Sequence, residues 1–118
     1  MEMRNKEAVL ALDLSSKPGW AIFKDGKLVD SGTLFPDKSV RDFGLYPQSY
    51  YQFAHHVCND IDELIYKIQS KYGQIEHFII EETVSSRNNL SQKILEYIHC
   101  LFIGSHFKSS IKYIRTGV

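Results

Sequence analysis

The stretch "VLALDLSSKPGWAIF", residues 9–23, places a carboxylate, Asp13, near the end of a strongly apolar run. A short polar turn follows, and Trp20 then opens a second apolar run. Near-continuous apolar character from Val9 to Leu14 is typical of a strand that is buried on both faces in the centre of a sheet. Because a buried, unpaired carboxylate is costly or takes up a proton, we expect Asp13 at an exposed strand end or beside a positive group.

Composition restricts the class of protein. A chain of 118 residues allows one domain with a real but modest core. Lysine and arginine balance aspartate and glutamate to a formal net charge of zero, which argues against a whole-surface polyanion binder but allows a local basic patch. No apolar run is long enough to span a bilayer, and the first residues lack the pattern of a signal peptide. Cys58 and Cys100 lack disulfide or zinc spacing and are interpreted as free, partly buried thiols, so we expect a cytoplasmic protein without membrane contact.

The first half of the chain predicts a hairpin and a long helix. Asp25-Gly26 separates two short runs, residues 20–24 and 27–32, and this dipeptide is a strong hairpin signal. Residues 36–47 are interpreted as a polar loop with aromatic side chains. From Pro47 to Tyr72 the apolar residues recur every three or four positions, which predicts an amphipathic helix.

The second half predicts a strand at 77–81, a polar loop at 83–89, a helix at about 90–107 and a short strand at 111–114. The order of elements is therefore strand, hairpin, helix, strand, helix, strand. This order predicts an α/β fold with a mixed five-stranded sheet and helices packed on it.

Asp13 and Glu81 are the sharpest chemical signal, because each ends an apolar strand that we expect in the centre of the sheet. Sites in such sheets form at the carboxyl ends of the strands. Two adjacent carboxylates raise each other's pKa unless a cation lies between them, and oxygen ligands suit Mg²⁺ or Mn²⁺. The structural alternative is that Asp13 caps a turn and Glu81 is a solvated strand end.

Two polar segments adjoin these carboxylates. Ser16 and Lys17 lie in the turn after Asp13, and Arg87 and Asn88 lie in the loop after Glu81, just before a helix N-terminus. Such groups are able to hold phosphate, although an ordinary turn and a helix cap explain them equally well. The helical histidines lack metal-ligand spacing with acids and are interpreted as surface or edge residues: His55, His56, His99 and His106.

Two motifs resemble those of the RuvC-type Holliday junction resolvases. "LALDLSSKPGWAIF" is similar to the opening of that family, where an apolar strand ends in Asp and a small polar turn leads to a second strand. "FIIEETVSSRNNLSQKILEY" looks like the second motif, an Ile-Glu strand end followed by a loop with a basic-Asn pair and a Ser-bearing helix. The resemblance extends from about Val9 to Arg115.

The resemblance implies a ribonuclease-H-like fold and an endonuclease that resolves Holliday, or four-way, junctions in DNA recombination and repair. It further implies a homodimer that uses Mg²⁺ or Mn²⁺, with metal-activated water attacking a phosphodiester. Asp13 matches the first catalytic and metal-binding aspartate, and Glu81 matches the catalytic and metal-binding glutamate. The DNA contacts that the resemblance implies are Ser16, Lys17, Arg87 and Asn88.

The sequence departs from this family at two points. Val84 stands where many members carry an aromatic residue, and no residue matches the further acidic ligands of the family. We therefore expect residues 1–118 to form a single RuvC-like domain that lacks the C-terminal helix and is inactive alone. The alternatives are a non-catalytic branched-DNA-binding domain of the same fold and a phosphate-binding domain of the actin-like or sugar-kinase type.

Overall fold

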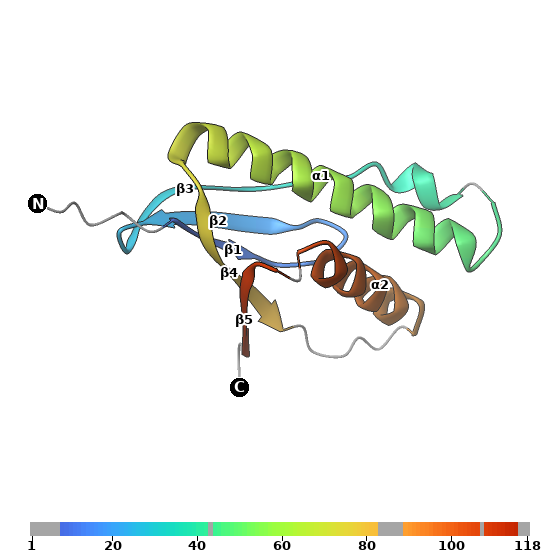
Figure 1. The fold of residues 1–118 in the computed structure, drawn as a ribbon. Coiled ribbons are helices and arrows are strands. Elements are labelled where there is room, and N and C mark those ends of the chain that lie inside the picture. Colours follow the sequence, from blue (N-terminus) through green and yellow to red (C-terminus); the bar gives the residue numbers. More distant parts are fainter. Residues whose placement is uncertain (1–7, 43, 83–88, 107, 116–118) are drawn as a thin grey trace, which may run out of the picture.

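A computed structural model of the chain describes residues 8–42, 44–82, 89–106 and 108–115. Within these residues, five strands form one sheet, and two α-helices pack on it (Figure 1). The strands are β1 (Ala8–Leu12), β2 (Gly19–Lys24), β3 (Lys27–Thr33), β4 (Ile75–Glu82) and β5 (Ser110–Arg115). The helices are α1 (Gln48–Tyr72) and α2 (Asn89–Ser105). The predicted α/β fold with a mixed five-stranded sheet is confirmed.

The strand order is β3-β2-β1-β4-β5. β2 runs antiparallel to both β1 and β3, whereas β4 runs parallel to both β1 and β5. The β2–β3 hairpin turns at Asp25 and Gly26, which both have positive φ, as the Asp-Gly signal predicts. Four strands, β1, β3, β4 and β5, therefore point their carboxyl ends to the same edge of the sheet.

Both helices cover one face of this sheet. Leu10 and Leu12 of β1 are buried, and they join one cluster with Phe53 of α1 and Phe102 of α2. The crossovers from β3 to β4 and from β4 to β5 advance in the same direction along the sheet. Because such connections are right-handed, they bring α1 and α2 to the same side (Figure 1).

The predicted burial of the first strand on both faces is wrong. Val9 and Ala11, which alternate with the buried residues of β1, are only half-buried, because both helices pack on the other face. Strand β1 also ends at Leu12, so Asp13 lies directly after it rather than inside it.

Three smaller features complete the comparison with the sequence. The segment expected to be a loop contains a short 3-10 helix, η1 (Lys38–Asp42). The carboxylate of Asp37 accepts hydrogen bonds there from the amide and the hydroxyl of Ser39, at 3.0 and 2.8 Å. The thiols are free, but only Cys58 is buried, whereas Cys100 is exposed. None of the described helices has the length and hydrophobicity to cross a membrane.

The ring of Trp20 packs against Gly32 on the edge strand β3 and leaves no room there for a side chain. A Cβ atom at Gly32 would lie 2.9 Å from Cζ2 of the Trp20 ring. We expect Gly32→Ala to lower the free energy of unfolding by about 1–2 kcal/mol, measured by urea denaturation. Gly104→Ala in α2 is the matched control, because a Cβ there meets no atom within 4 Å, and it should leave stability unchanged or raise it. Equal effects of the two substitutions would contradict this account of the Trp20 contact.

Candidate functional site

The parallel pairing of β1 and β4 brings Asp13 and Glu81 to one place. Leu12 lies beside Ile80 in the register, so the residue that follows each of them ends up at the same sheet edge. The amide of Asp13 donates to the carbonyl oxygen of Gly19 at 2.9 Å, which continues the β1–β2 ladder one residue beyond the strand. Neighbouring strands are about 4.8 Å apart, so the two side chains stand next to each other.

Asp13 and Glu81 line one hollow of about 350 Å³ on the sheet face opposite the helices. Side-chain alternation places them there, because Leu12 and Ile80 both point into the helix-covered core. Small residues, among them Ala11 and Gly19, leave the space in front of the carboxylates open. A Cβ at Gly19 would meet no atom within 4 Å.

Two neighbouring acidic side chains set the electrostatics of this hollow. Partial burial raises the pKa of Asp13, and the neighbouring negative charge of Glu81 raises it further. The positive charge that His99 is able to carry acts in the opposite direction on the same pKa. A cation bound between the two carboxylates would offset both unfavourable contributions.

The donor set fits a divalent cation in part. Carboxylate oxygens are the ligands that Mg²⁺ prefers, and Mg²⁺ is commonly held by one or two carboxylates, with water and substrate phosphate in the other positions. Within the described parts of the chain, no group of three or more His, Cys, Asp and Glu side chains is placed to hold a metal. Among the described residues the site therefore offers Asp13 and Glu81, and water or a ligand would suit the remaining positions.

His99 is a residue near this site that the sequence interpretation missed. It was expected to be a surface or edge residue, but its ring is half-buried near the end of β1. Nδ1 lies 3.0 Å from the hydroxyl oxygen of Tyr113 in β5, and the two rings stack with centroids 5.8 Å apart. No spacing in the sequence signals this arrangement, because it depends on the contact between α2 and β5.

The turn after Asp13 is compact and accessible. The amide of Lys17 donates to the hydroxyl oxygen of Ser15 at 3.2 Å, which gives Ser15 a structural role in the turn. Ser16 is half-exposed and Lys17 is exposed, so both remain able to meet a ligand. Arg87 and Asn88, the other two predicted DNA contacts, lie outside the described residues.

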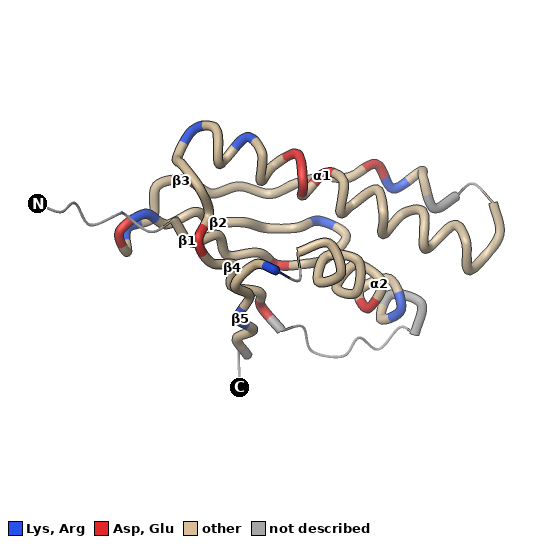
Figure 2. The backbone as a smooth tube through the Cα atoms, viewed as in Figure 1, with Lys and Arg blue, Asp and Glu red and all other residues tan. Residues whose placement is uncertain are grey.

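Positive charge is not concentrated anywhere in the described chain. Figure 2 shows lysine and arginine spread along the strands and helices, with acidic residues between them. This distribution agrees with the zero net charge and leaves a small number of local contacts as the route to binding a polyanion.

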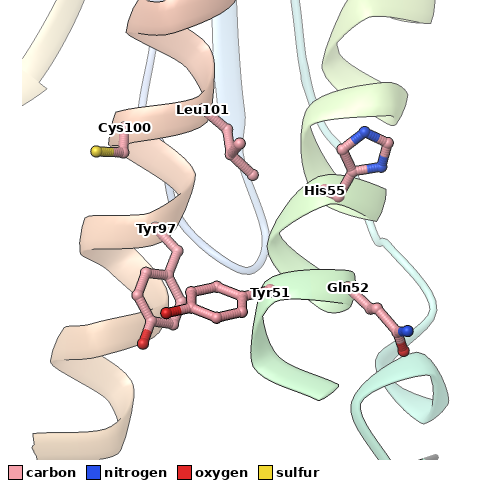
Figure 3. A pocket seen from close by; sticks show the side chains of 6 residues that line it. All are labelled: Tyr51, Gln52, His55, Tyr97, Cys100 and Leu101. Atoms are coloured by element: carbon pink, nitrogen blue, oxygen red, sulfur yellow. The ribbon is translucent and has the colours of Figure 1, made fainter. Parts of the chain in front are cut away.

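A larger hollow, of about 680 Å³, lies between α1 and α2 (Figure 3). The rings of Tyr51 and Tyr97 meet at its lower end with centroids 4.3 Å apart. The hydrogen bond with Tyr51 raises the pKa of Tyr97 to about 12, so this hydroxyl keeps its proton at neutral pH. None of the described side chains that line this hollow is a carboxylate, so we place the candidate reaction site at Asp13 and Glu81.

The five-stranded sheet with this topology, and with helices on it, defines a ribonuclease-H-like α/β fold. It is similar to a structure of T. thermophilus RuvC in complex with Holliday junction substrate, with a TM-score of 0.61 and 11% sequence identity. The match covers 92% of this chain, which spans 66% of that RuvC chain. The likeness supports the fold that the two sequence motifs predict.

A weaker likeness, with a TM-score of 0.41 and 15% identity, is found to a Ppx/GppA family protein from Aquifex aeolicus. That match covers 93% of this chain and 35% of the other. The sequence itself matches no family model and no curated protein.

The raised pKa of Asp13 predicts how stability depends on pH. Because the ionised carboxylate is disfavoured in the fold, its penalty is absent below the ordinary pKa of 3.8 and grows as the pH rises above 3.8. We expect Asp13→Asn to stabilise the fold at pH 7 without divalent metal, with a gain in the free energy of unfolding of at most about 1 kcal/mol. Thermal unfolding should show this gain as a higher melting temperature. The gain should vanish at about pH 3.

Thermal scans of two further variants control this prediction. Glu81→Gln relieves the same repulsion, so its gain should not add fully to that of Asp13→Asn. Glu76→Gln, an exposed position near the other end of β4, should have no effect. Full additivity of the first two variants would show that the two carboxylates do not interact.

Proposed function

We propose that this chain is a metal-dependent, structure-selective DNA endonuclease whose substrate is the four-way junction. The observation that carries the proposal is the pair Asp13 and Glu81, which adjoin on neighbouring parallel strands and line one open hollow. The fold similarity to RuvC in complex with Holliday junction substrate supports the choice of DNA as the substrate class.

The roles of the two carboxylates follow from their surroundings. Asp13 is fixed by its backbone bond to Gly19, and Glu81 stands on the strand that pairs with both β1 and β5. Together they would hold Mg²⁺ or Mn²⁺ on the open face of the sheet. The bound ion would supply Lewis-acid stabilisation of a phosphodiester and lower the pKa of a water molecule.

Phosphate contacts are assigned to the segments that flank this hollow. Ser16 and Lys17 are accessible in the turn after Asp13, and a hydroxyl and an ammonium group are suitable donors to phosphate oxygens. Arg87 and Asn88 follow Glu81 in the chain and are proposed for the same role. Because the positive charge of the chain is dispersed, these few contacts would carry much of the electrostatic attraction.

The proposal includes a homodimer and a cytoplasmic location. A formal net charge of zero puts no long-range repulsion between two copies, and the two free cysteines suit a reducing compartment. Light scattering on the purified chain tests the dimer.

Cleavage of a four-way junction in Mg²⁺ or Mn²⁺ tests the enzymatic proposal, and cutting by the 118-residue chain would correct the expectation that this chain is inactive alone. We expect Asp13→Asn and Glu81→Gln to lower the rate at least a hundredfold while junction binding persists, because each removes a metal ligand and misplaces the reacting water. Glu76→Gln, on the same strand as Glu81 but exposed near its other end, should cut at the wild-type rate. Cleavage that survives Asp13→Asn would overturn the assigned site.

Salt dependence of binding tests the phosphate contacts. We expect Lys17→Ala and Arg87→Ala each to reduce the slope of log K against log salt by about one unit. Lys67→Ala is the matched control, because this exposed lysine lies in the C-terminal half of α1. A slope that is unchanged in all three variants would show that neither Lys17 nor Arg87 contacts phosphate.

A second candidate function is a branched-DNA-binding domain without turnover. It is favoured by one observation, since the described residues provide no third metal-binding side chain beside Asp13 and Glu81. Junction binding that is unaffected by divalent metal, with no cleavage in Mg²⁺ or Mn²⁺, would establish this function in place of the first.

A further inference from the structure

His99 occupies an unusual position for a helical histidine. Its Nε2 atom is completely enclosed and makes no hydrogen bond of ordinary length and angle. Its other nitrogen, Nδ1, lies 3.0 Å from the hydroxyl oxygen of Tyr113. Because a buried polar nitrogen without a partner is costly, its retention here calls for a physical reason.

Two groups near the end of β1 act on the His99 ring. The backbone of Leu14 and the carboxylate of Asp13 are the two groups that favour a proton on His99. Leu14 is fully buried on the helix side of the sheet, whereas Asp13 lines the hollow on the opposite side. His99 therefore approaches the end of β1 from behind the carboxylate.

The protonation of the ring follows from its environment. Burial lowers the pKa of His99, so the neutral ring, with one N–H group, is favoured at neutral pH. If Tyr113 donates its hydroxyl proton to Nδ1, the single ring proton lies on Nε2. Nε2–H is then a donor, and the backbone carbonyl of Leu14 is an acceptor of suitable chemistry.

We propose that His99 is a positioning residue that holds the Leu14 backbone through Nε2–H, while Tyr113 fixes the ring through Nδ1, and so orients Asp13. The contact of His99 with Tyr113 joins α2 to β5, and the proposed bond to Leu14 would add the end of β1. The effect of His99 on metal binding rests on the function proposed above, whereas its proposed bond to the Leu14 backbone does not.

Two substitutions of His99 separate positioning from packing. Gln places an amide near the position of Nε2 and keeps a donor, whereas Leu keeps the bulk and removes the donor. If His99 only fills space, Leu should do as well as Gln. If His99 positions the strand end, His99→Gln should stay close to wild type and His99→Leu should not.

The main measurement is amide hydrogen exchange of Asp13, whose N–H is bonded to the carbonyl oxygen of Gly19. We expect exchange to become about five- to tenfold faster in His99→Leu, and to a smaller extent in Tyr113→Phe. His77→Gln is the matched control, because His77 also contacts a β5 hydroxyl, Ser110 at 2.8 Å, near the start of β4. It should leave exchange at Asp13 unchanged.

A long-range ¹H–¹⁵N spectrum of the wild-type chain tests the tautomer directly. The proposal requires the proton of His99 on Nε2, and a proton on Nδ1 would overturn it, as would equal exchange rates in His99→Leu and His99→Gln. Mn²⁺ titration adds the functional arm, with affinity about tenfold weaker in His99→Leu. If the wild-type chain binds no Mn²⁺, the proposed function fails, while the exchange and tautomer results still decide the role of His99.

Discussion

The parallel pairing of β1 with β4 is the constraint on which the rest of the structure depends. It sets Leu12 beside Ile80 in the core, and this register leaves Asp13 and Glu81 as neighbours on the other face of the sheet. A shift of one residue between these strands would exchange core and surface side chains. The same hydrophobic burial that stabilises the centre of the sheet therefore also holds two mutually repelling carboxylates together.

Much of the fold could be predicted because its signals are local. The Asp25-Gly26 turn, the three-four spacing along α1 and the two apolar strands each act over a few residues, and each element is present in the structure. The placement of the two carboxylates together was also predictable, because Asp13 directly follows one strand and Glu81 is the last residue but one of another, and the order of elements places both strands in the centre of the sheet.

The features that sequence reasoning missed depend on contacts between distant segments. The one-sided layering follows from the direction of two crossovers rather than from the hydrophobicity of β1, which reads as buried on both faces. The place of His99 depends on how α2 returns to β5, since its partners are Tyr113 and the end of β1. Neither arrangement leaves a periodic trace in the sequence.

The placement of the carboxylates outside the helix-covered core has an evolutionary consequence. The side chains that hold the sheet to the helices, such as Leu10, Phe53 and Phe102, lie on the opposite face from Asp13 and Glu81. Selection on these core residues and selection on the two acids therefore act on different positions, although Leu12 belongs to the core and also lines the hollow. A substitution that removes an acid from the hollow therefore leaves the packing of Leu10, Phe53 and Phe102 intact.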